Sequence, residues 1–214
     1  MIKGLIFQFD GVIADISGFR FSAFERICEE KGCRLDANDY ELVKAMPSER
    51  ALGLLLDIGN VSCSERELKD LCKRKDQYFK EALAEISTNA LTSGIREFIR
   101  QAREDGYITA LLVYEDCAYT VMESLHIASL FDRILPSCDE PQTDAFVKAA
   151  DALDLQKQEC VAFVSSSAAA AMVRAADLRC VAVGQSEASF YSDYHIRDFR
   201  NQNAGILIRK AEGE

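Results

Sequence analysis

The sequence has 214 residues, of which 49% are hydrophobic and 28% charged, so it suits one folded domain, or one domain carrying an insertion, and excludes a disordered or fibrous chain. Its 25 basic and 35 acidic residues give a net charge of −10, which argues against nucleic acid or a membrane surface as a partner. No apolar run approaches the roughly 20 residues of a membrane span, and the start lacks a signal-peptide pattern, so we expect a cytoplasmic protein.

A short apolar run over residues 4–9 ends in Asp10-Gly11 and predicts a buried strand that leads into a turn. Amphipathic helix patterns follow, rich in Glu, Lys, Leu and Arg, and no convincing strand pattern interrupts them. The clearest of these helix patterns cover residues 21–31, 49–57 and 64–86. We therefore predict an all-helical cap domain of residues 15–89, inserted into a core domain made of residues 1–14 and 90–214.

Beyond the insertion, apolar strands alternate with helices. Strands are predicted over residues 107–113, 133–136, 160–164 and 179–183. Helices are predicted over residues 93–105, 118–125, 143–153 and 166–176. This alternation indicates an α/β protein with a doubly wound parallel sheet. The polar and aromatic stretch 185–203 has no clear periodicity, and we expect it to lead into a final short strand at residues 205–208.

The eight cysteines show no C-x-x-C spacing, and several lie inside apolar runs, as Cys160 and Cys180 do. We interpret them as reduced, buried small hydrophobic residues. The two histidines, His126 and His195, lie near no nucleophile or metal motif. A metal site built on sulfur is therefore not expected.

The opening GLIFQFDGVI, residues 4–13, resembles the first motif of the haloacid dehalogenase-like (HAD) superfamily, which reads apolar-Phe-Asp-x-Asp-Gly-Val. The helical insertion resembles that family's cap domain. The β-phosphoglucomutase-like subfamily is similar at three further places: residues 64–78 of the insertion, Phe131-Asp132, and the Pro-x-x-Asp-x-Phe pattern of residues 141–146. The resemblance reaches residue 184 and implies a Rossmann-like core with a helical cap.

The resemblance also implies a chemistry, in which an Asp nucleophile attacks phosphorus and a second Asp, two residues later, acts as general acid and base. Gln8 stands at the nucleophile position, while Asp10 retains the acid/base position. A neutral amide is a poor nucleophile at phosphorus and cannot form an aspartyl-phosphate. One of the two carboxylates is therefore missing.

The phosphate-binding positions of the family are substituted too. Val113 matches the family's Ser or Thr after the second core strand, and valine offers no side-chain hydrogen bond. Glu140 matches the family's Lys, so the charge at this position is inverted and would repel phosphate. Both substitutions oppose the binding of a phosphate group.

The magnesium loop of the subfamily, usually Glu-Asp-Ser, matches Val164-Ser165-Ser166 here. Since Mg²⁺ prefers carboxylate oxygens, we predict neither a metal nor any other cofactor. In the cap, the Gly-x-x-Arg loop that grips sugar phosphate matches residues 45–48. Arg50 is a weak substitute for its arginine, and Lys75 keeps its family position.

Five acids are expected near the mouth of the cleft: Asp10, Glu115, Asp116, Asp139 and Glu140. They would form either a new metal or acid/base site or merely solvated loop tips, and we favour the second reading because loop tips commonly carry charge. Ser165-Ser166-Ser167 would either cradle an anion or simply cap the following helix, and capping alone accounts for the serines.

Three hypotheses follow. The first is a HAD-fold pseudoenzyme that binds or regulates an unknown small molecule or protein. The second is a weak or altered phosphatase or phosphomutase that acts on a small phosphorylated metabolite through Asp10 and nearby acids. The third is a sensor that keeps cap closure around a ligand without phosphate.

Overall fold

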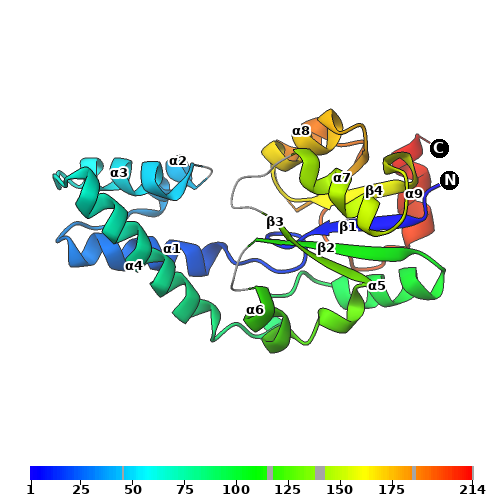
Figure 1. Cartoon of the computed structure of the whole chain (residues 1–214), viewed down its shortest axis with the longest axis horizontal. Coiled ribbons are helices and arrows are strands. Elements are labelled where there is room, and N and C mark those ends of the chain that lie inside the picture. Colours follow the sequence, from blue (N-terminus) through cyan, green and yellow to red (C-terminus); the bar gives the residue numbers. More distant parts are fainter. Residues whose placement is uncertain (45, 115–117, 138–142, 185–186, 214) are drawn as a thin grey trace. The chain divides into compact units, whose positions relative to one another are not determined.

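The computed structural model describes residues 1–44, 46–114, 118–137, 143–184 and 187–213. These residues divide into two compact units, Met1–Asp15 with Ser87–Glu214, and Ile16–Ile86. The first unit contains a six-stranded sheet, and the second consists of helices. The prediction of an α/β fold with an inserted helical cap is confirmed (Figure 1).

The sheet has the order β3-β2-β1-β4-β5-β6, and all its strand pairs are parallel. The strands are β1 (Gly4–Gln8), β2 (Ile108–Tyr114), β3 (Arg133–Ser137), β4 (Cys160–Val164), β5 (Arg179–Val183) and β6 (Tyr194–Ile196). All but β6 were predicted to within one residue. Because β1 is central, its carboxyl end lies between the carboxyl ends of β2 and β4. We call this end of the sheet the carboxyl edge.

Side chains of the central strands alternate between two apolar layers, as the two-residue period of a strand requires. Ile6 and Ala162 point into a cluster with residues of α7 (Thr143–Ala152) and α8 (Ser167–Ala175). Phe7 points the other way and stacks on Phe163 with ring centroids 4.7 Å apart. Figure 1 shows α7 and α8 on one face of the sheet and α5 (Ile95–Glu104) on the other. The paired strands β1 and β4 therefore lie between two packed apolar layers.

The aromatic layer on the second face is built from five phenylalanines in different parts of the chain. Phe7 and Phe163 contribute from the sheet, and the other three are Phe98, Phe131 and Phe199. Phe199 reaches the layer because its main-chain N–H donates to the oxygen of Ser93 at 3.0 Å. The described part of this stretch, residues 187–203, shows no sequence periodicity but contributes Phe199 to the packing.

The prediction of a final strand at residues 205–208 is wrong. The chain instead forms β6 at Tyr194–Ile196 and then α9 over Ala204–Glu212. The side chain of Asn203 accepts a hydrogen bond from the main-chain N–H of Ile206 at 3.1 Å and so begins the helix. Leu207, Ile208 and Ala211 are then buried on one face. Helical spacing of these apolar residues, rather than strand alternation, determines the structure.

The remaining core elements are short. They are α6 (Ala118–Leu125) and the 3₁₀ turns η1 (Thr88–Ala90), η2 (Ala128–Leu130), η3 (Lys157–Glu159) and η4 (Glu187–Tyr191). The predicted helices of the core are confirmed, with α6 exact and the others ending within two residues of the predicted limits. No described helix is long and apolar enough to cross a bilayer.

The inserted unit contains the helices α1 (Ser17–Glu30), α2 (Ala37–Val43), α3 (Ser48–Ile58) and α4 (Glu65–Leu83). The sequence predicts all of these except α2, a seven-residue helix whose start is marked by the side chain of Asp36, which accepts from the N–H of Asn38 at 2.7 Å. The helices enclose their own apolar cluster, which includes Ile27, Leu52 and Leu71. This unit therefore has an independent core.

The cysteine interpretation is correct for three residues and incomplete for three others. Cys28, Cys160 and Cys180 are buried free thiols, whereas Cys33, Cys63 and Cys72 are half-buried. Burial raises the pKa of Cys160 and of Cys180 to about 12. Cys117 and Cys138 lie outside the described residues.

Candidate functional site

The carboxyl edge brings the ends of β1 and β4 together through polar contacts. Gln8 is the last residue of β1 and is only 6% exposed. Its Oε1 accepts a hydrogen bond from the main-chain N–H of Ser165 at 3.3 Å. The Ser165 hydroxyl in turn donates to the main-chain oxygen of Asp10 at 2.7 Å. Two residues from β1 and its turn are thereby joined to the loop that follows β4.

The turn after β1 is tight because the main-chain oxygen of Phe9 accepts several N–H groups. Those of Ile13 and Ala14 lie 2.9 and 3.3 Å away. Gly11 has a positive φ of 72°, which glycine adopts at little cost. A Cβ on Gly11 would lie 2.6 Å from the Ser165 Oγ. The turn and Ser165 are therefore in direct contact.

Asp10 lies two residues after the end of β1 and is half-buried. It forms an isolated β-bridge with Ala14. Its carboxylate is the one acid of the predicted set that lies within the described residues. Glu115, Asp116, Asp139 and Glu140 lie outside them. The acidic cleft mouth and the inverted charge at Glu140 therefore remain predictions.

Val113 lies near the end of β2, paired in register with Pro136 of β3. It is 3% exposed, so its side chain is buried. Being a hydrocarbon, this side chain offers no hydroxyl. Beyond β3, Asp144 in the first turn of α7 is exposed, and its carboxylate lies 2.6 Å from the ammonium of Lys148. This hydrogen-bonded pair lowers the pKa of Asp144.

The serines after β4 have separate roles. Ser166 caps α8, since its side chain accepts a hydrogen bond from the N–H of Ala169 at 3.2 Å. This confirms that a capping serine precedes the helix. Ser165 instead bonds backward to the turn after β1. Val164, the neighbouring position, is completely buried in β4.

The two cap residues singled out from the sequence lie in the helical unit, and their environments differ. Lys75 is 6% exposed. Its Nζ donates to the Ser48 hydroxyl at 2.9 Å and lies 2.6 Å from a carboxylate oxygen of Asp76. The same ammonium lies 5.2 Å from the centroid of the Phe24 ring. Arg50, on α3, is exposed. Lys75 is thus bound within its own unit.

Gln8, Val164 and Ser165, the described residues at the family's magnesium positions, do not fit a magnesium ion. Mg²⁺ requires several oxygen ligands and favours carboxylates. Here Gln8 contributes a neutral amide, Val164 a hydrocarbon, and Ser165 a hydroxyl whose proton points at the Asp10 main-chain oxygen. Within the described part of the chain, no three His, Cys, Asp or Glu residues are grouped so as to hold a metal.

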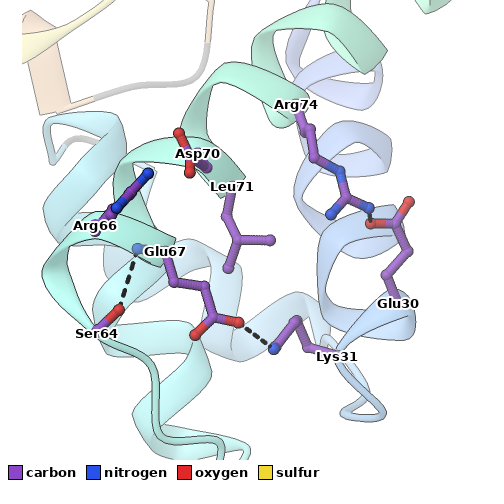
Figure 2. A pocket seen from close by; sticks show the side chains of 8 residues that line it. All are labelled: Glu30, Lys31, Ser64, Arg66, Glu67, Asp70, Leu71 and Arg74. Atoms are coloured by element: carbon purple, nitrogen blue, oxygen red, sulfur yellow. Dashed lines mark hydrogen bonds and ion pairs between the residues drawn. The ribbon is translucent and has the colours of Figure 1, made fainter.

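Two hollows in the described residues are lined by none of the residues named above at the carboxyl edge. One, of about 530 Å³, is bordered by Tyr107 and Ile108 at the start of β2, the opposite end of the sheet. The other, of about 420 Å³, lies between α1 and α4 of the helical unit and is shown in Figure 2. Its lining includes the ion pairs Lys31–Glu67, at 2.6 Å, and Arg74–Glu30.

The comparisons with known proteins agree with this architecture. A family model described as haloacid dehalogenase-like hydrolase matches residues 5–183. The chain belongs to this family. The resemblance inferred from the first motif is thereby confirmed, as is the helical cap on a Rossmann-like core.

The proteins similar to this chain include two named β-phosphoglucomutase and one named CbbY. A β-phosphoglucomutase of Bacillus subtilis (strain 168) is 25% identical over 217 residues, covering 99% of this chain and 96% of that protein. The solved β-phosphoglucomutase of Clostridium difficile has a TM-score of 0.84 at 24% identity, covering 100% and 98% of the two chains. CbbY of Rhodobacter sphaeroides, solved with phosphate, has a TM-score of 0.70 at 22% identity, covering 94% and 96%.

Sequence reasoning identified Gln8, Asp10, Val164 and Ser165 as neighbouring positions but missed how they are connected. The contact between Ser165 and the turn after β1 depends on the register of β1 against β4, which pairs Phe7 with Phe163. Register was not predicted. The available signal was the Asp-Gly turn after one strand and a serine directly after another, because parallel neighbours end at the same edge.

Proposed function

We propose that this chain is a haloacid dehalogenase-like protein that has lost magnesium-dependent phosphoryl transfer and acts by binding or regulating a small molecule or a protein. The observation that carries the proposal is the buried Gln8 amide at the end of β1, whose oxygen already accepts a hydrogen bond from Ser165. A neutral amide held in this way offers no carboxylate to attack phosphorus.

The surroundings of Gln8 support the same reading. On the adjacent strand β2, the buried Val113 has a hydrocarbon side chain in place of a hydroxyl. Val164 and Ser165 supply no carboxylate for a metal. Glu140, by its place in the sequence, would repel a phosphate group. Loss of one nucleophile typically lowers turnover by about 10⁶-fold in hydrolases, and further losses in the same catalytic unit add little.

A second candidate function is a weak or altered phosphatase or phosphomutase that acts on a small phosphorylated metabolite. The retained, half-buried Asp10 favours it, since this carboxylate could still activate water or protonate a leaving group. The name of the Bacillus subtilis relative, β-phosphoglucomutase, points to a phosphorylated glucose as the substrate to try first. The other acids in this hypothesis are Glu115, Asp116, Asp139 and Glu140.

The experiment that separates the two candidates measures turnover with Mg²⁺ present. The full chain is incubated with a generic aryl phosphate and, separately, with a phosphorylated β-glucose, next to its Asp10→Asn variant and the Bacillus subtilis relative as a positive control. The pseudoenzyme proposal expects no turnover above the Asp10→Asn background. Magnesium-dependent turnover that this substitution abolishes would overturn it.

A restoration series tests whether the substituted positions are correctly assigned. The combined changes Gln8→Asp, Glu140→Lys, Val164→Glu and Ser165→Asp rebuild the family's charges at the carboxyl edge. Calorimetric titration with Mg²⁺ should then detect binding that the natural chain lacks. A folded restored variant without magnesium binding would contradict the assignment of these positions.

A further inference from the structure

Two hydrogen bonds connect β1 to the loop after β4, and neither involves a charged group. The Ser165 N–H donates to the Gln8 Oε1 at 3.3 Å, and the Ser165 hydroxyl donates to the Asp10 main-chain oxygen at 2.7 Å. Both oxygens lie at the carboxyl edge, where the resemblance to the family implies a magnesium ion. Each oxygen here faces a proton supplied by one residue, Ser165.

We propose that Gln8 and Ser165 form a metal-independent staple, which holds the carboxyl edge in place of a divalent cation. This inference rests on the proposed function and deepens it. A cation that approached the Asp10 main-chain oxygen would compete with the Ser165 hydroxyl for it. It would gain no negative ligand from Gln8 in return, because an amide is neutral.

Burial supports the staple. The Gln8 residue is only 6% exposed, so its amide oxygen has little access to water, and losing its N–H donor would leave a buried acceptor unpaired. Across the described residues, every buried side-chain nitrogen or oxygen has a hydrogen-bond partner. Among the described residues of this edge, no buried polar side chain is therefore left without a partner.

Steric contact fixes the staple in one position. Gly11 lies so close to Ser165 that an added Cβ would come within 2.7 Å of the Ser165 Cβ. The Ser165 side chain is therefore confined between the turn after β1 and the end of β4. A hydroxyl confined in this way needs no cation to orient it.

The first test requires no substitution. Thermal unfolding of the natural chain is followed in a chelator and in millimolar Mg²⁺ or Mn²⁺, since a ligand that binds only the folded state raises the melting temperature. The staple predicts the same melting temperature in all three solutions. A cation-dependent rise would overturn the proposal.

The second test compares two serines at the start of the same helix. Ser165→Ala removes the hydroxyl bonded to Asp10, whereas Ser167→Ala changes a half-buried serine of the first turn of α8. The first substitution should lower the melting temperature by about 2–4 °C, the shift for one lost hydrogen bond in a chain of this size. The second should leave it nearly unchanged. Equal melting temperatures for the two variants would refute the staple.

The third test converts the staple into a cation site. A chain carrying both Gln8→Asp and Ser165→Asp places two new carboxylates beside Asp10, so its folded state should be less stable in chelator and recover when Mg²⁺ is added. A folded double variant whose stability does not change when Mg²⁺ is added would overturn the claim that these two residues exclude the cation. If it does not fold, the first two tests still decide.

The failure of this inference and of the proposed function can be told apart. Ser165→Ala reports on stability alone, so a neutral result removes the staple and leaves the phosphoryl-transfer proposal standing. Conversely, magnesium-dependent turnover of the natural chain that Asp10→Asn abolishes would refute the pseudoenzyme proposal. It would do so whatever the effect of Ser165→Ala on stability.

Discussion

Gly11 and Ser165 are in such close contact that a Cβ on Gly11 would lie 2.6 Å from the Ser165 Oγ. Gly11 also has a φ of 72°, in the left-handed region that residues with a side chain rarely adopt. The Asp-Gly pair after β1 therefore has two structural reasons for its glycine. One is the turn itself and the other is the serine that follows β4.

Gly11→Ala should lower the free energy of unfolding by about 2–4 kcal/mol, since it adds a steric conflict with Ser165 to the cost of a left-handed alanine. Gly106→Ala is the matched control, because Gly106 has a φ of 90° and nothing within 4 Å of its added Cβ. It should cost only about 1 kcal/mol. Urea denaturation measures both, and equal losses would show that the contact with Ser165 is unimportant.

Asp132 should contribute to acid stability. Burial, the largest single influence, would raise the pKa of this carboxyl, but hydrogen bonds from Thr109 and the charge of Arg103 together outweigh burial and lower it. The Thr109 N–H and hydroxyl lie 2.8 and 2.9 Å from one carboxylate oxygen. A lowered folded-state pKa contributes stability above the unfolded pKa of about 3.9, and this contribution is lost as pH falls through the folded value.

Asp132→Asn should therefore destabilise the chain at pH 7 by about 1–3 kcal/mol, the cost of losing charged hydrogen bonds. The difference from the natural chain should shrink as pH is lowered below about 4. Asp105→Asn, at an exposed acid that ends α5, should change stability by less than about 0.5 kcal/mol. Unfolding in urea across this pH range gives the comparison, and a pH-independent effect of Asp132→Asn would contradict the account.

Asn203 caps the first turn of α9 through its side chain. Asn203→Ala removes the side-chain acceptor of the Ile206 N–H and should cost about 0.5–2 kcal/mol. Asn203→Ser retains an acceptor and should cost much less, since serine and asparagine cap helices about equally well. Urea denaturation again decides, and equal losses in the two variants would show that α9 does not depend on its cap.

Much of the core was predictable because its strands are short, mostly apolar and bounded by turns. Cys160–Val164 and Arg179–Val183 were predicted with their exact limits. The strand β6 was not predictable in this way. It has only three residues, and it forms by pairing with β5, where Ile196 is opposite Val183. Such an element has no pattern of its own and exists only through tertiary pairing.

The candidate site was predictable as a set of positions, since four residues near two strand ends lie at one edge of a parallel sheet. Its hydrogen bonds were not, because the contact of the Ser165 hydroxyl with the Asp10 main-chain oxygen also depends on strand register and on the turn after β1. The burial of Lys75 was also missed, since α4 is otherwise highly charged along its length. Only packing against Phe24 and Ser48 reveals it.

The buried thiols should be slow to react in the folded state. The thiolate is the reactive form, and burial raises the pKa of Cys28, Cys160 and Cys180 to about 12. A disulfide reagent at pH 8 should therefore leave these three thiols unmodified in the native chain, and all eight cysteines should react in denaturant. Peptide mass mapping identifies the unmodified sites. Rapid native modification of Cys180 would contradict the buried strand β5.

The most direct measurement of the central claim asks whether the first motif accepts a phosphoryl group. The chain is mixed with a reactive phosphoryl donor and Mg²⁺, quenched in acid, and analysed by intact and peptide mass, with the Bacillus subtilis β-phosphoglucomutase treated in parallel. Because Gln8 replaces the nucleophile, we expect no phosphorylated peptide from this chain under conditions that label the Bacillus subtilis β-phosphoglucomutase. A phosphoryl group on the peptide that contains Gln8 and Asp10 would contradict the account.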